Sequence, residues 1–249
     1  MVCPYETRLA AAISIESDYS MKIRFLIPGL ILLVFFVAAC SPPPVLRNEK
    51  LLNDTSLITN EPCEAPCWNG ITPGETAWSE ALTIVEDDSR MNDPEIQNAQ
   101  EGSAIGAQWS KIEGDPCCQM VSEDGQMVSF ISLSFAPEMT VDEVLEAQGE
   151  PDYALGTPVT DDQAAVYLFY PDKSLIVVVF VAGAEAELEA GNEVIGALYA
   201  TPKDMDLTIK TSKLHTWNGY APFSEYRADA PDSEFEITPE VTLTPTPGQ

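Results

Sequence analysis

The sequence predicts an α+β fold made of two repeats, in which each repeat is a helix followed by antiparallel strands and both helices pack on one sheet face. Three observations support this prediction. Apolar residues recur at helical spacing over 77–85 and again over 141–145. Stretches with apolar residues at alternate positions follow each helix, as expected of strands. Finally, 73–82 and 137–145 share Pro, Thr, Glu and Leu in the same order, about 64 residues apart.

The first repeat, residues 61–136, begins with a turn-rich stretch and a helix that ends near residue 86. The Thr76 hydroxyl is expected to cap this helix by accepting an early backbone N–H. Asp93 and Pro94 predict a second, short helix that ends near residue 100, because Pro fits the first helical position. Strands are then predicted at residues 104–110, 117–122 and 127–135, with the hairpin signal Asp124-Gly125 before the last one.

The second repeat, residues 137–227, begins with Thr140 and Glu143, a T-x-x-E capping box that satisfies two otherwise unpaired amides. Gly149 and Pro151 end this helix. Strands are then predicted at residues 165–170, 174–181 and 194–200. The strand at 174–181 is apolar on both faces, so it is expected in the centre of the sheet.

Ahead of the repeats lies an apolar run, residues 25–37, which follows the cations Lys22 and Arg24. A basic start, a short apolar run and a small-residue exit are typical of a secretory signal peptide. The run is shorter than the roughly 20 apolar residues that a membrane-spanning helix needs. Its end, Val37-Ala38-Ala39-Cys40, resembles the lipobox of bacterial lipoproteins. That resemblance implies removal of residues 1–39 and acylation of Cys40, which would anchor the protein at the extracytoplasmic face of the cell membrane. An ordinary cleaved signal and an uncleaved anchor are the alternatives.

The remaining segments are expected to lack regular structure. Residues 1–20 carry three acidic groups where signal peptides are normally basic, so we interpret Met21 as the true start and 1–20 as a mis-called extension. Residues 40–60 carry three consecutive prolines at 42–44 and are predicted to be a tether behind the acylated cysteine. Residues 202–227 are predicted to be irregular. The acidic, Pro- and Thr-rich tail, 228–249, is predicted to be disordered.

The charge of the chain excludes some classes of partner. The formal net charge is −28, and residues 40–249 carry the same charge because residues 1–39 hold three cations and three acids. Such a surface repels phosphate backbones and anionic lipid headgroups, so nucleic-acid binding is not expected. It is also consistent with attraction of a basic partner, although solvation alone explains it.

Four cysteines follow the expected acylation site: Cys63, Cys67, Cys117 and Cys118. In an exported protein they are disulfide candidates, and three pairings exist. Pairing within Cys63–Cys67 leaves the two adjacent cysteines as a vicinal disulfide or as thiols. We expect the crossed pattern, which avoids a vicinal bond. A zinc site is not expected, because C-x3-C with an adjacent C-C pair is not a usual ligand spacing.

The second repeat resembles the BamE/SmpA-like lipoprotein domain in Met139-Thr140, Glu143-Val144 and Gly149-Glu150-Pro151, although Glu138 replaces the family's Gly. The resemblance covers about 16 residues. In that family, and in the similar tandem β-lactamase-inhibitor fold, two helices pack on one face of an antiparallel sheet and the free face binds proteins. The resemblance therefore implies an interaction module with no catalytic residues to transfer.

No catalytic, metal or cofactor motif is found in the sequence, and an enzyme is not expected. The single histidine, His215, is interpreted as a packing residue, and the many acidic pairs are too frequent to identify an active site. We therefore expect a membrane-anchored, extracytoplasmic module that binds an unknown envelope protein. The rival hypotheses are an envelope hydrolase that uses paired carboxylates and a small-ligand-binding lipoprotein. The candidate partner contacts are Trp109, Trp217, Tyr220 and Tyr226.

Overall fold

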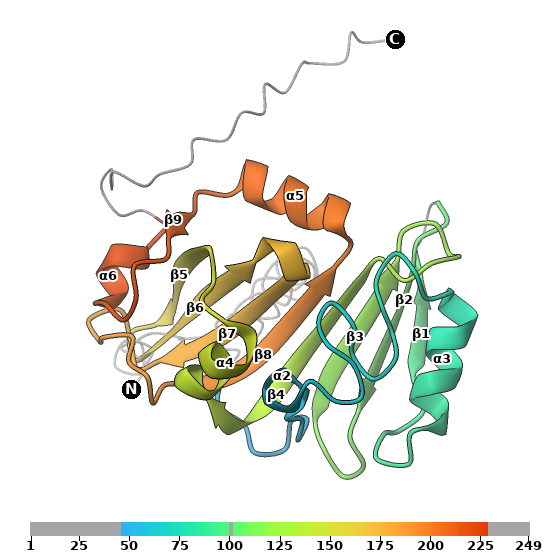
Figure 1. Cartoon of the computed structure of the whole chain (residues 1–249). Helices are drawn as coiled ribbons and strands as arrows, with labels where there is room; N and C mark the ends of the chain where they lie inside the picture. The colour runs from blue at the N-terminus through green and yellow to red at the C-terminus, as the bar shows by residue number, and fades with distance from the viewer. Residues whose placement is uncertain (1–45, 100–101, 229–249) are drawn as a thin grey trace, which may run out of the picture. The chain divides into compact units, whose positions relative to one another are not determined.

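The computed structural model describes residues 46–99 and 102–228 and contains one nine-stranded antiparallel sheet (Figure 1). The strand order is β1-β2-β3-β4-β8-β7-β6-β5-β9. The strands are β1 (Glu95–Asn98), β2 (Ile105–Ser110), β3 (Pro116–Ser122), β4 (Phe130–Thr140), β5 (Tyr153–Thr160), β6 (Gln163–Tyr170), β7 (Leu175–Val181), β8 (Glu193–Ala200) and β9 (His215–Thr216). The predicted signal peptide, the mis-called extension, Cys40 and all of the predicted tail except residue 228 lie outside the described residues.

The predicted α+β fold of two helix-then-sheet repeats is wrong, because one large antiparallel sheet with few, short helices forms instead. Strand β4 pairs with β8 over Phe130↔Ala200 to Ser134↔Gly196, so the strands of both expected repeats belong to one continuous sheet. The expected boundary between residues 136 and 137 falls inside β4. The helices in the described part are few and short: α2 (Ser56–Thr59), α3 (Trp78–Asp87), α4 (Val141–Gln148), α5 (Pro202–Thr211) and α6 (Phe223–Tyr226), with the 3-10 turn η1 (Pro171–Lys173). The single sheet also overturns the fold that the BamE-like resemblance implies.

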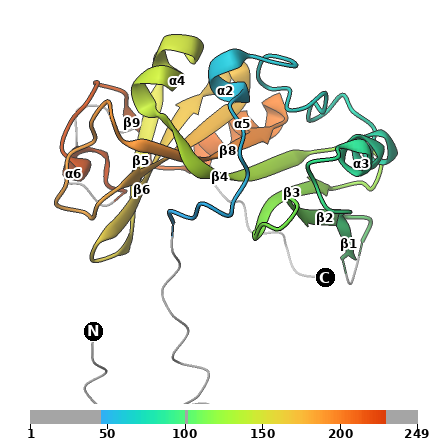
Figure 2. The same ribbon diagram turned by 90° about the horizontal axis from the view of Figure 1, so that it is seen from below.

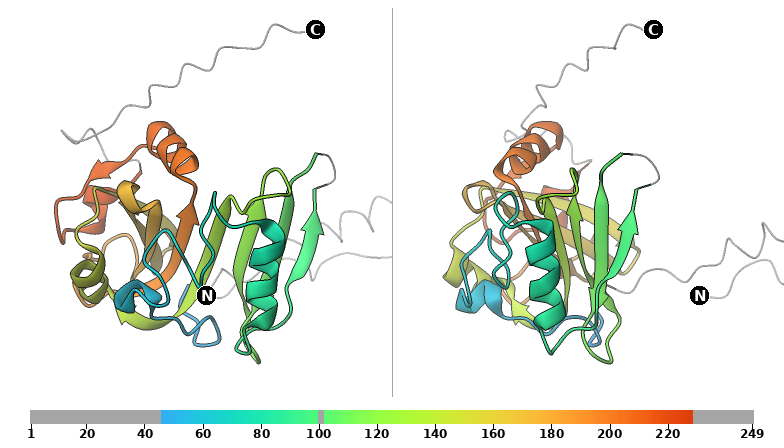
Figure 3. Two further views of the ribbon diagram at one scale, coloured as in Figure 1. Left: turned by 45° about the vertical axis from the view of Figure 1, so that its right-hand side comes forward. Right: turned by 90° about the vertical axis from the view of Figure 1, so that its right-hand side faces the viewer.

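The two faces of the sheet are covered differently. Helices α2, α3 and α4 lie on one face, which we call the inner face (Figures 2 and 3). The main apolar core lies there and includes Ile131, Val177 and Tyr199. Helix α5 packs on the opposite, outer face, where Met205 joins a small second cluster with Ile176. Because neighbouring residues of a strand point to opposite faces, β7 contributes to both clusters.

Residues 46–60, which were expected to form a tether, are part of the folded structure. Leu52 and Leu57 are buried in the main core. The Leu52 N–H donates to the Ser134 carbonyl at 3.2 Å, and Leu52 accepts from the Ala136 N–H at 2.9 Å. The apolar residues of this segment fill part of the inner face. Their scattered leucines have no helical or strand period, so the sequence pattern did not reveal their burial.

Several helix ends can be compared with the predictions. The Thr140 capping box is present, and the Thr140 N–H donates to Glu143 Oε2 at 2.9 Å. Thr76 does not cap α3, which begins one residue later; its hydroxyl instead accepts from the Thr72 N–H at 2.8 Å. The helix predicted to start at Asp93 is wrong, because β1 forms there by pairing with β2.

Candidate interaction surfaces

An aromatic cluster lies between β9 and α6, where the sequence analysis placed three candidate contacts. The Trp217 ring stacks on Tyr226 with centroids 5.7 Å apart and meets the Tyr220 ring edge-on at 6.1 Å. Tyr226 is buried, and its hydroxyl donates to the Gly219 carbonyl at 2.7 Å. Tyr220 is 44% exposed and Trp217 is half-buried. Only the Trp217–Tyr220 pair therefore presents aromatic surface to a partner.

Acidic residues surround this exposed pair. Partial burial and, next, the negative charge of Asp142 raise the pKa of Tyr220. The loop before β8 runs beside the cluster, because the Leu188 N–H donates to the Ala221 carbonyl at 2.9 Å. That loop carries exposed Glu187 and Glu189. We call Trp217, Tyr220, Asp142, Glu187 and Glu189 the aromatic–acidic patch. Its composition favours a basic partner surface, because cations are attracted both to carboxylates and to aromatic faces.

Trp109, the fourth candidate contact, is a core residue. It lies on the inner face of β2, is 3% exposed, and its ring centroid is 6.0 Å from that of Trp68. Its indole N–H has no hydrogen-bond partner within the described part of the chain. A buried side chain in this position contributes to stability and does not touch a partner.

The cysteines pair differently from our expectation. Cys63 bonds to Cys67 and Cys117 bonds to Cys118, so the crossed pattern is wrong. The strand register explains how adjacent cysteines come together: Trp109 pairs with Cys118 and Ser110 with Pro116, which leaves Cys117 as the extra residue of a bulge. A bulge breaks the alternation of side chains. Both Cys117 and Cys118 are consequently buried.

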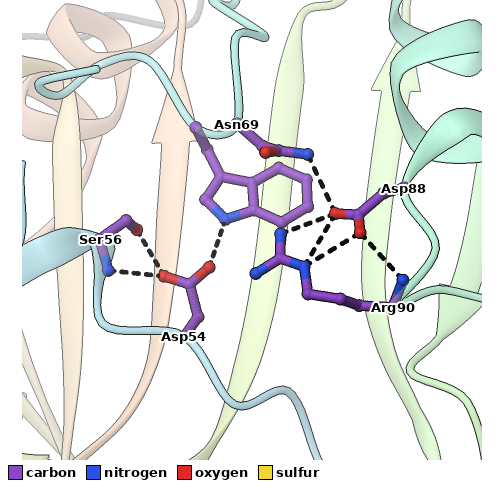
Figure 4. A network of polar contacts seen from close by, with 6 residues as sticks. Asp54, Ser56, Asn69, Asp88 and Arg90 are labelled. Atoms are coloured by element: carbon purple, nitrogen blue, oxygen red, sulfur yellow. Dashed lines mark hydrogen bonds and ion pairs between the residues drawn. The ribbon is translucent and has the colours of Figure 1, made fainter. Parts of the chain in front are cut away.

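A polar network links three loops beside the inner face (Figure 4). Asp54 accepts from the Ser56 N–H at 2.9 Å and from the Trp68 indole N–H at 3.1 Å. Arg90 donates to both Asp88 oxygens, and this hydrogen bonding lowers the pKa of Asp88. The loops line a small cavity of about 180 Å³. Because nearly all of these polar groups satisfy one another, the network holds the loops in place and leaves little to recognise a ligand.

The outer face of the sheet lacks charge over its central strands. Cross-strand register places its residues in three rows. The rows are Gly106-Val121-Phe130, Gln108-Gln119-Ser132-Leu198 and Ser134-Gly196-Val178-Tyr167, and we call these eleven residues the outer patch. No Asp, Glu, Lys or Arg is among them, although the chain has 40 acidic residues.

Two hollows lie on the outer patch. One, of about 170 Å³, lies over β1, β2 and β3 around Gly106. The other, of about 380 Å³, lies between the outer patch and residues 46–51. Figure 2 shows these first described residues reaching the sheet from the side opposite α2, α3 and α4. Nine of the eleven outer-patch residues are half-buried, Gln119 is exposed and Gly196 is buried, so the outer patch is a partly exposed surface with residues 46–51 at its border.

The single histidine of the chain lies inside the fold. His215 is buried, and its Nε2 lies 2.9 Å from the Arg227 carbonyl. Over 46–99 and 102–228, no three His, Cys, Asp or Glu side chains gather in a way that could hold a metal ion. In the same ranges no helix is long and apolar enough to cross a membrane.

Comparison of the chain with protein-family models, with curated proteins and with solved structures found no match.

Sequence reasoning located the exposed aromatics but missed the surfaces around them. The outer patch was not recognised, because its uncharged residues are separated in sequence and meet only through cross-strand pairing. Alternation of polar and apolar residues in β4, from Ile131 to Phe135, was the available signal for one exposed sheet face.

Proposed function

We propose that this protein is a lipoprotein anchored at the extracytoplasmic face of the cell membrane through acylated Cys40, and that it binds an envelope protein without catalysing a reaction. The lipobox-like Val37-Ala38-Ala39-Cys40 supports the anchor. The binding role rests on one observation, the exposed Trp217–Tyr220 pair bordered by the loop that carries Glu187 and Glu189.

The partner surface that fits this site is basic. The aromatic pair offers ring faces to a Lys or Arg side chain, an interaction of about 0.5–2 kcal/mol depending on solvent exposure. Asp142, Glu187 and Glu189 add longer-range attraction, which mainly accelerates association. The −28 charge of the whole chain acts in the same direction and weakens as ionic strength rises.

The test is crosslinking on intact cells followed by recovery of the tagged protein and mass spectrometry. We expect one or two envelope proteins with the native chain, and at least about tenfold less of them with Tyr220→Ala, the loss typical of an interface anchor. Ile112→Ala is the matched control, because Ile112 is 53% exposed on a different surface and should leave recovery unchanged.

Two results would contradict the proposal. Equal recovery with Tyr220→Ala and with native protein would exclude the aromatic–acidic patch as the contact. Equal recovery with an unanchored Cys40→Ser chain would show that membrane anchoring plays no part in finding the partner.

A further inference from the structure

The point where the described chain begins lies on the outer face of the sheet. The Leu46 N–H donates to Gln163 Oε1 at 2.9 Å, at the start of β6. Arg47 forms an ion pair with Glu193, and its guanidinium carbon lies 5.5 Å from the centre of the Phe180 ring. From there the segment passes along the larger hollow to Leu52, which reaches the inner face. The described chain therefore starts, at Leu46, on the outer side of the sheet.

The connection between Cys40 and Leu46 is short. Six Cα–Cα steps reach at most about 22 Å when fully extended. Eight strand spacings give the nine-stranded sheet a width of about 38 Å. The tether expected from the sequence, from Cys40 through residue 60, would have more than three times the reach of the connection from Cys40 to Leu46. An acyl chain on Cys40 thus holds the outer side of the sheet near the bilayer.

Charge selects which surface meets the lipid. The turn between β5 and β6 carries exposed Asp161 and Asp162, and the loop before β8 carries Glu187 and Glu189. These groups are repelled by anionic headgroups at distances below the Debye length of about 8 Å. The outer patch has no charged residue, and the segment at its border is close to neutral, with exposed Lys50 and Glu49 and with Arg47 paired to Glu193. The outer patch is therefore repelled less than the β5–β6 turn and the loop before β8.

We propose that the outer patch lies against the headgroup surface of an anionic bilayer. This inference rests on the proposed acylation of Cys40 and adds an orientation to it. The uncharged Gln and Ser side chains form hydrogen bonds with headgroups, and Lys50 pairs with a lipid phosphate. The aromatic–acidic patch belongs to the β9–α6 border of the sheet and stays accessible to a protein partner.

The test uses the acylated full-length mature protein in vesicles of phosphatidylethanolamine and phosphatidylglycerol, with a photoactivatable group on a fraction of the headgroups. After irradiation, mass spectrometry locates the lipid adducts. We expect adducts on residues 46–51 and on outer-patch peptides of β3 and β4, at least tenfold above those on α3 or on residues 215–226.

Matched variants sharpen the result. The double change Gln108→Glu and Gln119→Glu adds two negative charges to the outer patch and should reduce its adducts several-fold. Ser79→Glu with Thr83→Glu adds the same charge to exposed positions of α3, on the other side of the sheet, and should change nothing. Gln119→Lys should increase the adducts. Thermal unfolding of each variant checks that the fold is retained.

Three outcomes would overturn the orientation. Adducts mainly on α3 or on residues 215–226 would place another surface on the lipid. Protein–protein crosslinks between outer patches would identify a second copy as the occupant. An intact mass without acyl chains would refute the anchor and the orientation together, whereas acylated protein with adducts elsewhere would refute the orientation alone.

Discussion

The inner and outer faces of the sheet use the same strands for different purposes, and β7 shows the difference within two residues. Val177 points to the inner face and is fully buried, whereas Val178 points to the outer face and is only partly buried. The inner face is closed by α2, α3, α4 and the loop before α3. The outer face is covered at one end by α5, is bordered by residues 46–51, and is elsewhere only partly buried. Stability should therefore depend mainly on the inner face.

The largest expected difference is between two valine truncations on β7. Val177→Ala should lower the free energy of unfolding by about 2–3 kcal/mol, because it removes buried methyl groups and leaves a cavity. Val178→Ala should cost less than about 1 kcal/mol, since solvent or neighbours already fill the site. Urea unfolding measures both free-energy changes, provided that the dependence of the unfolding free energy on urea concentration is the same in each variant. Equal losses would contradict the distinction between the faces.

Two glycines test how closely the strands approach one another. A Cβ at Gly196 of β8 would lie 2.7 Å from the Leu133 carbonyl oxygen, which is backbone and cannot move away easily. Gly196→Ala should therefore destabilise the protein by about 1–3 kcal/mol. At Gly106 of β2 the nearest atom would be 3.8 Å away, so Gly106→Ala should change stability by less than about 0.5 kcal/mol. Similar melting temperatures for the two variants would refute the predicted contact.

The Asp88–Arg90 pair should contribute a smaller amount that depends on pH. Hydrogen bonding from Arg90 lowers the pKa of Asp88 in the folded protein, so its contribution is present above the unfolded value near 3.8 and is lost as pH falls through the folded value. At pH 7, Asp88→Asn should cost about 1 kcal/mol, because Arg90 is half exposed. The difference from native protein should shrink below about pH 4. The neighbouring Asp87→Asn serves as the control, and a pH-independent difference would argue against the ionised pair.

The smallest effect is expected from the amide row of the outer patch. Gln108→Ala and Gln119→Ala should each change the unfolding free energy by less than about 0.5 kcal/mol, because no partner is lost inside the fold. Their effect should appear only in lipid crosslinking. A loss of 2 kcal/mol or more in denaturant unfolding would mean that these side chains are structural.

Local patterns in the sequence predicted the strands that are regular and central. The apolar run of β7 predicted an interior strand, and the capping box at Thr140 predicted the start of α4. Strand β5 was missed because Gly156 and Pro158 interrupt its pattern. Helix α5 was missed although its signal was present, since Thr201 caps it by accepting from the Asp204 N–H and Pro202 follows.

The role of each aromatic residue could not be predicted in the same way. Trp109 and Tyr226 are buried and Tyr220 is exposed. In the sequence, however, all three have similar mixtures of polar and apolar neighbours. Their exposure depends on which sheet face the distant segments cover, and cross-strand register decides that. The vicinal disulfide was missed for the same reason, because a bulge in β3 is a property of the β2–β3 pairing.

The most direct test of the central claim is the mass of the N-terminal peptide of protein isolated from cell membranes. The account predicts that this peptide begins at Cys40 and carries two or more acyl chains, so that Leu46 lies within about 22 Å of the lipid. A peptide that begins elsewhere, or an unmodified Cys40, would contradict the anchor and the orientation that depends on it.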